Sequence, residues 1–434
     1  MYRRLNQDVL RLCFFQLRKD AASGVDGVTF QEYEKDLEAN LTDLVGRLKR
    51  KAYRARLVRR KYIPKGPGKF RPLGIPVLED KLLQVAVTQI LLAIYEVDFL
   101  PCSYGYRPGI GAHDAIKALT DELQFGGHNF VVEADIKGFF DNLRWEWLER
   151  MLEQRIGDGA LLNLIRKWLR AGILEEDGRV IHPQTGTPQG GVVSPVLANI
   201  YLHYVLDLWF EHKLRPLQRG RCRMIRYADD FVACFEYRHE AEAFEQGLRS
   251  RLAKFGLEVA TDKTKRLRFG RKGGPHNERF DFLGFEFYWE LDRQGKPRVK
   301  RRTATKKWLA GRQRMREWIK QHRHQKLRPL MKTLKAKLQG TWNYYGLIGN
   351  YRRMQLFNED VRRTLFKWLN RRSQRRSVNW RAFNRLMERF QMPRPRIMEK
   401  KDQPRPCQQE LSFCQRLLDF LRPGASRLVN ARVS

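Results

Sequence analysis

Residues 226–232 read RYADDFV, and this stretch sets two adjacent carboxylates, Asp229 and Asp230, between two apolar runs. Apolar runs on either side of a short polar turn predict a β-hairpin over residues 221–237, with Ala228 and Asp229 at its tip. Paired Asp residues are also ordinary turn chemistry, because Asp tolerates the backbone angles of turns and bonds its own backbone. The pair alone therefore leaves a catalytic and a purely structural interpretation open.

A third acid, Asp135, closes a similar apolar run upstream. Residues 130–141 read FVVEADIKGFFD, which predicts a short strand that ends at the acid and then turns. A strand laid beside the hairpin would bring Asp135 close to Asp229. Magnesium prefers carboxylate, water and phosphate oxygens, and polymerases use two such ions to clamp the attacking and leaving oxygens of phosphoryl transfer. Three acids in this arrangement predict a site for two metal ions.

The charge of the chain points to a polyanionic partner. It carries 85 Lys and Arg against 48 Asp and Glu, a formal net charge of +37. Attraction to a phosphate backbone would make binding strongly salt-dependent. Within residues 296–320 only Glu317 opposes a dense run of Lys and Arg. Such runs are usually solvated faces, but one this one-sided repels itself unless a partner neutralises it.

The length of 434 residues leaves room for two or three domains with their own cores. Helical periodicity mixes with short strands, without a regular βαβ repeat, and this predicts an α+β core. Beyond Lys300 the pattern turns wholly helical, so the best domain boundary lies near that residue. We find no apolar span of about twenty residues and no signal peptide, so we expect a cytoplasmic bacterial protein without a membrane partner. Six scattered cysteines without a CxxC pair predict neither disulfides nor structural zinc.

A series of further motifs occurs in a fixed order from residue 24 to residue 397. They are GVDGVT (24–29), YIPKGPGKFRPLGIP (62–76), SYGYRPG (103–109), EADIKGFFDN (133–142), GTPQGGVVSPVLANIYL (186–202), RYADDFV (226–232), GLEVATDKTK (256–265), FDFLGFEF (280–287), GTWNYYGLIGN (340–350) and RRSQRRSVNW (371–380). In this number and order they resemble the reverse transcriptases encoded by bacterial group II introns.

The resemblance implies a right-hand polymerase fold. Fingers and palm, with an antiparallel sheet, would occupy residues 1–295, and a helical thumb or maturase (X) domain residues 296–398. Residues 399–434 would form a short basic segment that is a candidate for DNA binding. Many relatives carry a C-terminal HNH nuclease with paired Cys and clustered His, and the residues after Arg396 contain no such pattern. We therefore expect no DNA cleavage.

The resemblance also assigns the metal ligands. Asp135 and Asp229 match the two metal-binding carboxylates of the palm, the carbonyl of Ile136 matches a backbone ligand, and Asp230 matches the supporting acid. The implied cofactor is two Mg²⁺ ions, for which Mn²⁺ is a possible substitute. All three acids are therefore expected to be catalytic.

Further positions match residues that bind the nucleotide and the primer. Lys69 and Arg71 would supply positive charge to the triphosphate, since Arg suits bidentate phosphate contacts, although a solvated basic hairpin is the alternative. The ring of Phe140 would occupy the space that a ribose 2′-hydroxyl requires, with Phe139 in the core. The remaining matches are Gln189 in the nucleotide pocket, Lys263 at the departing pyrophosphate, where Lys265 could substitute, and Leu283 and Gly284 in the primer grip.

The function implied is an RNA-directed DNA polymerase that uses an RNA template, a DNA or RNA primer and dNTPs. Its gene would lie in a group II intron, and the protein would bind the intron RNA and assist splicing and retrohoming. One alternative is a related reverse transcriptase in host defence or CRISPR adaptation. Another is a non-enzymatic RNA-binding splicing factor, but a binder has no need for acids beside anionic RNA.

Overall fold

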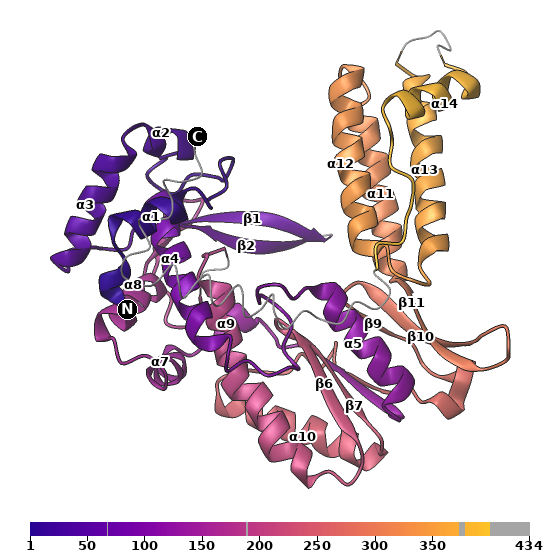
Figure 1. Cartoon of the computed structure of the whole chain (residues 1–434), viewed down its shortest axis with the longest axis horizontal. Coiled ribbons are helices and arrows are strands. Elements are labelled where there is room, and N and C mark those ends of the chain that lie inside the picture. Colours follow the sequence, from indigo (N-terminus) through magenta and orange to yellow (C-terminus); the bar gives the residue numbers. More distant parts are fainter. Residues whose placement is uncertain (67, 188–189, 373–377, 400–434) are drawn as a thin grey trace, which may run out of the picture.

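The computed structural model describes residues 1–66, 68–187, 190–372 and 378–399. The N-terminal part combines helices with a long two-stranded ribbon and a short strand pair (Figure 1). Its elements are α1 (Gln7–Phe14), α2 (Phe30–Lys35), α3 (Leu37–Lys49), β1 (Val58–Gly66), β2 (Lys69–Ile75), α4 (Leu78–Tyr95), α7 (Trp145–Glu153), α8 (Gly159–Leu169), β4 (Ile173–Leu174) and β5 (Val180–Ile181). The strands form one sheet in the order β2-β1-β4-β5.

A second sheet, called here the central sheet, has the order β6-β7-β3-β8. Its strands are β3 (Phe130–Ala134), β6 (Cys222–Tyr227), β7 (Asp230–Phe235) and β8 (Lys265–Arg268), and the helices near it are α5 (Ala112–Phe125), α6 (Phe139–Asn142), α9 (Ser194–Leu202) and α10 (Arg238–Lys254). Antiparallel pairing of β6 with β7 confirms the predicted hairpin. Since β3 pairs with β7 on the other side, the strand that ends at Asp135 lies beside that hairpin, as expected.

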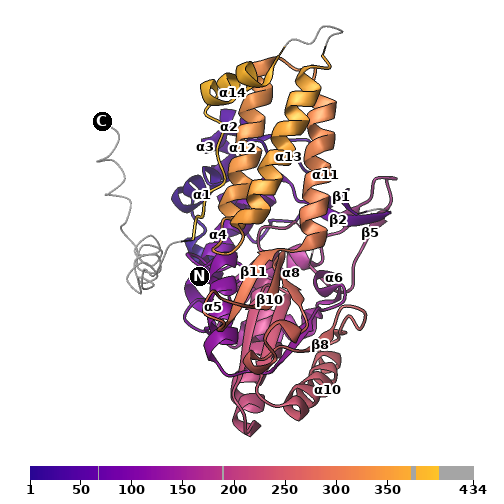
Figure 2. The same cartoon turned by 90° about the vertical axis from the view of Figure 1, so that its right-hand side faces the viewer.

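The third part begins with a sheet of order β11-β10-β9 and continues into a helical bundle. Its elements are β9 (Phe280–Phe282), β10 (Phe285–Leu291), β11 (Pro297–Thr303), α11 (Thr305–His322), α12 (Leu327–Tyr345), α13 (Tyr351–Leu369) and α14 (Trp380–Arg389). Figures 1 and 2 show the bundle standing on the side of the molecule that carries β10 and β11. The boundary expected at residue 296 falls in the turn between these two strands, whereas the helices begin at Thr305. The division into domains stays a proposal, and all of the expected C-terminal segment except Glu399 lies outside the described residues.

Residues 390–399, called here the return segment, run back along the bundle toward its base (Figure 1). Trp342 donates its indole N–H to the carbonyl of Pro393, at 3.0 Å. At the base, the Glu399 carboxylate pairs with Arg301 of β11, and both side chains are nearly buried. The return segment therefore ties the far end of the bundle to the sheet from which the bundle starts.

The structure bears on two features that the sequence was not expected to contain, a membrane-spanning helix and disulfide bonds. None of the helices in these residues combines the length and apolar character needed to cross a membrane. Cys13, Cys102, Cys222 and Cys234 are buried free thiols, and Cys407 and Cys414 lie outside the described part of the chain.

Candidate active site

The hairpin turn presents the paired acids at the end of the central sheet. Tyr227 and Asp230 are the last paired residues of β6 and β7, which leaves Ala228 and Asp229 as the turn. Ala228 has a φ of 57°, a left-handed conformation that costs an L-residue about 1–2 kcal/mol. The fold imposes this conformation, and Asp229 follows it directly, half-buried.

Backbone hydrogen bonds fix the position of Asp135 beside this turn. Ala134 pairs with Phe231 in the β3–β7 ladder, so the next residue emerges next to the hairpin tip. The carbonyl of Asp135 accepts from the amide of Ala260 at 2.8 Å, and the amide of Lys137 donates to Glu258 at 2.9 Å. Ile136, between them, is buried and forms an isolated bridge with Val259. The segment that carries the expected ligands is thus held on both sides.

The charges of the other two acids act on the carboxyl of Asp230. The pKa of this carboxyl is raised to about 6, first by desolvation and then by the charges of Asp229 and Asp135, while the charges of Lys263 and Lys307 act in the opposite direction. Asp230 keeps solvent-exposed surface, but the surrounding protein displaces much of its water. Mutual repulsion among carboxylates is relieved by any cation placed between them. Lys307 belongs to α11, so the helical bundle contributes positive charge to the site.

Lys263 places a positive charge beside the three acids. Its ammonium makes a short ion pair with the Asp135 carboxylate, and this hydrogen bond is the main cause that raises the pKa of Lys263. Among the described residues, no three His, Cys, Asp or Glu side chains lie in an arrangement that could already hold a metal ion. The donor chemistry nevertheless suits hard divalent cations, because all three side chains offer carboxylate oxygens and their repulsion calls for positive charge. The residues expected to hold the metals therefore fit them in chemistry, with Lys263 as the present counter-ion.

The expected sugar-binding residue lies against the loop that leads to Gln189. Phe139 is buried, at 2% exposure, which confirms its core role, and Phe140 is half-buried. The amide of Thr187 donates to the Phe140 carbonyl at 2.8 Å. Gly186 packs so closely that a Cβ there would lie 2.7 Å from the same carbonyl oxygen, so only glycine fits. Gln189 itself lies outside the described residues.

The β1–β2 ribbon reaches the same region from the N-terminal part. A Cβ on Gly190 would lie 2.5 Å from the carbonyl oxygen of Gly74 at the end of β2. The loop of residues 186–190, called here the nucleotide loop, is therefore in direct contact with the ribbon. Arg71 is exposed on β2, and nothing is described of the Lys69 side chain. Burial raises the pKa of Tyr106, the charge of Asp229 raises it further, and the charge of Arg71 lowers it. The charges of Arg71 and Asp229 therefore both act on the Tyr106 hydroxyl.

Leu283 and Gly284 form the turn between β9 and β10. Both have positive φ, 49° and 80°, as a two-residue type I′ hairpin turn requires. The Leu283 carbonyl accepts from the hydroxyl of Tyr344 at 2.8 Å, and the Gly284 carbonyl accepts from the amide of Ala304 at 2.9 Å. The expected primer grip is thus held by the residue before α11 and by the last turn of α12.

Residues without an expected role also belong to the site. The pKa of Tyr106 responds to the charges of both Asp229 and Arg71, and Glu133 sits on β3 two residues before Asp135. The pKa of Glu133 is raised to about 7, mainly by desolvation and also by the charge of Asp281. The available sequence signal was a charged side chain inside the apolar run 130–136.

The raised pKa of Glu133 predicts a pH-dependent contribution to stability. A carboxyl whose folded pKa is raised stabilises the fold below its unfolded value, near 4.5, and this stabilisation is lost as the pH rises through about 7. We therefore expect Glu133→Gln to melt at a higher temperature than the wild type at pH 8, with the difference closing toward pH 5. Thermal unfolding across this range measures it. A difference in Tm that stays constant with pH would contradict the assignment.

Comparison with known proteins gives two family matches, one before and one within the helical bundle. Residues 63–287 match the reverse transcriptase (RNA-dependent DNA polymerase) family, and residues 310–386 match the maturase-specific domain of group II introns. Protein YkfC of Escherichia coli K12 is 33% identical over 307 residues, which cover 64% of this chain and 78% of YkfC. Group II intron-encoded protein LtrA of Lactococcus lactis subsp. cremoris is 29% identical over 437 residues, covering 81% of this chain and 71% of LtrA. Among solved structures, telomerase from Candida albicans with a fragment of telomeric RNA aligns over 83% of this chain and 68% of its own, with a TM-score of 0.45 and 14% identity.

Proposed function

Because this chain belongs to the reverse transcriptase family and carries a group II intron maturase domain, we propose that it copies RNA into DNA with two Mg²⁺ ions at Asp135, Asp229 and Asp230. One observation carries the assignment of these residues. Pairing of β3 with β7 brings Asp135 beside the turn with the other two acids, and the charges of Asp135 and Asp229 raise the pKa of Asp230.

The side chains have separate tasks in the proposed reaction. The three carboxylates and the Ile136 carbonyl would hold the ions, which would supply charge stabilisation for the phosphoryl transfer; Mn²⁺ is a possible substitute. The primer end is held at the turn of Leu283 and Gly284, whose carbonyls are fixed by Tyr344 and Ala304. The chain thus positions the primer hydroxyl and the metal ligands on neighbouring turns.

The nucleotide is bound by residues from the ribbon and from the nucleotide loop. Arg71, with Lys69, binds the triphosphate, and Gln189 lines the pocket beside the sugar. The Phe140 ring excludes a 2′-hydroxyl. Lys263 now neutralises Asp135, and we propose that it moves to the pyrophosphate once cations occupy the acids. This exchange keeps a positive charge beside the Asp135 carboxylate in both states.

The proposed RNA partner is a group II intron transcript, whose splicing and retrohoming the protein would assist in the bacterial cytoplasm. The match to the maturase-specific domain supports this, as does the net charge of +37. The basic helix α11 also supports it, because five of its exposed residues are Lys or Arg and one, Glu317, is acidic. The test is binding of the intron RNA that flanks the gene, compared with a shuffled RNA of equal length at several salt concentrations. Equal affinity for both RNAs would leave the polymerase assignment intact and remove the maturase proposal.

The polymerase proposal is tested by primer extension on an RNA template with dNTPs. We expect full-length cDNA that requires Mg²⁺, that is lost on chelation and that returns when Mg²⁺ or Mn²⁺ is added in excess. An enzyme that makes no cDNA, or makes it equally well with chelator present, contradicts the proposed mechanism.

A further inference from the structure

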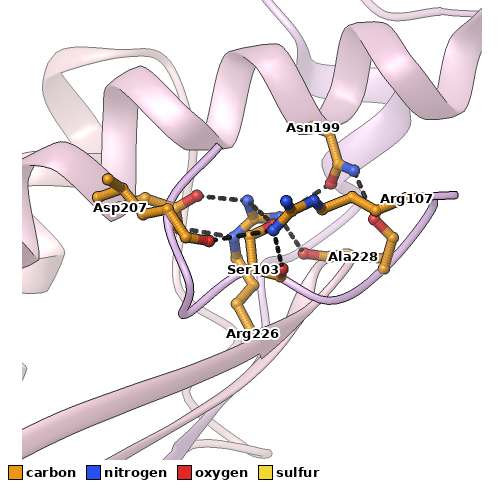
Figure 3. A network of polar contacts seen from close by, with 8 residues as sticks. Ser103, Arg107, Asn199, Asp207, Arg226 and Ala228 are labelled. Atoms are coloured by element: carbon orange, nitrogen blue, oxygen red, sulfur yellow. Dashed lines mark hydrogen bonds and ion pairs between the residues drawn. The ribbon is translucent and has the colours of Figure 1, made fainter. Parts of the chain in front are cut away.

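The guanidinium of Arg226 lies fully buried directly behind the turn that carries the acids (Figure 3). Its Nε and Nη2 donate to the two carboxylate oxygens of Asp207, at 2.7 and 2.5 Å, and neither side chain has any exposed surface. Removing two charges from water carries a large solvation cost, and buried ion pairs are often no better for stability than apolar side chains of equal volume. A contribution to stability is therefore a weak explanation for the presence of the buried Arg226–Asp207 ion pair.

The other donors of Arg226 reach the turn itself. Nη1 donates to the carbonyl of Ala228 at 3.0 Å and to the Oδ1 of Asn199 at 3.0 Å, and Nη2 donates to the hydroxyl of Ser103 at 2.7 Å. Ala228 is the residue with the left-handed backbone, and Asp229 follows it. The guanidinium thus holds the carbonyl of the peptide that links the strained residue to the first acid.

The loop of residues 102–105 also packs against this turn. A Cβ on Gly105 would lie 2.3 Å from the backbone nitrogen of Ala228, so the loop backbone touches the turn. Asn199 donates its Nδ2 to the Gly105 carbonyl at 2.5 Å, and the main chain of Arg226 bonds to both Cys102 and Tyr104 at 2.8 Å. Asn199 therefore connects the guanidinium to the loop that supports the turn.

A local irregularity of the helix brings Asn199 and Asp207 to the same guanidinium. In a regular α-helix of 3.6 residues per turn, residues eight apart lie about 80° out of line. Here α9 ends at Leu202, and residues His203–Asp207 form a π-helical turn, which is wider and rotates less per residue. Such turns are frequent at functional sites.

We propose that Arg226, fixed by Asp207 and Asn199, is a positioning residue that sets the carboxylates of Asp229 and Asp230 for cation binding. This inference rests on the proposed role of the two acids and extends it to the buried groups behind them. We propose that Arg226 acts on the acids through the Ala228 carbonyl, to which its Nη1 donates. A purely structural role would lower stability without changing how the folded protein binds cations.

The test replaces the ion pair by apolar side chains in the double variant Arg226→Met/Asp207→Leu, which leaves no unpaired buried charge. A second variant, Asn199→Ala, keeps the ion pair and removes one support of the guanidinium. The control is Tyr53→Phe, which removes a buried hydrogen bond from Tyr53 to the Asp80 carboxylate. Both residues are far in sequence from Asp229 and Asp230. Circular dichroism and thermal melting show which variants are folded.

Cation binding is measured by Mn²⁺ titration with electron paramagnetic resonance, and activity by primer extension as a function of Mg²⁺. We expect the double variant to need about tenfold more Mn²⁺ and Mg²⁺, a difference of about 1.4 kcal/mol. Asn199→Ala should shift both midpoints in the same direction by a smaller factor, and Tyr53→Phe should leave them unchanged. The KM for dNTP should change little while kcat falls.

The outcomes separate this inference from the function on which it rests. Folded variants with wild-type Mn²⁺ affinity and a wild-type Mg²⁺ midpoint overturn the positioning role. If the double variant does not fold, the Asn199→Ala variant tests the positioning role instead. A folded Asn199→Ala protein with wild-type Mn²⁺ affinity also overturns that role. A wild type that makes no cDNA contradicts the proposed function, and the Mn²⁺ titrations still decide whether Arg226 positions the acids.

Discussion

Asp229→Ala is expected to lower the rate of cDNA synthesis by about a thousandfold. Metal ions stabilise the charge of phosphoryl transfer by several kcal/mol, and each 1.36 kcal/mol is a factor of ten in rate. Removing one of three clustered ligands should therefore cost about 4 kcal/mol of transition-state stabilisation. Single-turnover primer extension at saturating dNTP measures the loss, because it isolates the chemical step from product release.

The matched control for this variant is Asp177→Ala. Asp177 is exposed in the connection between β4 and β5 and bonds only Arg179 in the contacts we describe, so its loss should leave the rate unchanged. Thermal stability provides a second check. The charge of Asp229 raises the pKa of Asp230, so its removal relieves repulsion and should not lower Tm. A folded Asp229→Ala enzyme with wild-type rate would remove Asp229 from the metal site.

Phe140→Ala is expected to lower discrimination against ribonucleotides by about a hundredfold. A pocket wall that rejects an added hydroxyl by contact contributes about this factor. The measurement is the ratio of kcat/KM for dCTP and CTP opposite the same template base. Incorporation of dCTP should change less than incorporation of CTP, because the deoxyribose does not need the space that the ring fills.

Phe139→Ala is the companion variant. Phe139 is adjacent, but buried in the core, so truncation should cost about 3–5 kcal/mol of stability and leave the sugar ratio unchanged. If Phe140→Ala retains the wild-type ratio, or if Phe139→Ala loses it, the assignment of the two rings is wrong.

The parts of the site that the sequence predicted are the ones set by local patterns. The hairpin around Asp229 follows from apolar runs and a short polar turn, and the strand before Asp135 follows from one apolar run. Pairing of β3 with β7 then places both acids at the same end of one sheet. The α+β fold followed by helices was predictable for the same reason, since a change of hydrophobic period is visible within a short window.

The parts that the sequence did not predict depend on contacts between distant segments. Arg226 meets Asp207 and Ser103 across 19 and 123 positions, and no periodicity encodes such partners. The π-helical turn that aligns Asp207 with Asn199 looks like an ordinary helix in the sequence. Similarly, Lys263 was assigned to pyrophosphate from its motif, whereas its ion pair with Asp135 depends on how residues 258–260 pack on the end of β3.

The return segment has a consequence for motion of the helical bundle. The chain enters the bundle directly after Thr303 and returns through Glu399 to Arg301, so both connections converge on neighbouring residues of β11. Asn350, at the start of α13, also accepts from the amide of Thr303 at 2.8 Å. A rotation of the bundle relative to the central sheet would therefore displace this strand. Because β11 pairs along its length with β10, which follows the primer-grip turn, such a rotation would move the primer end together with the bundle.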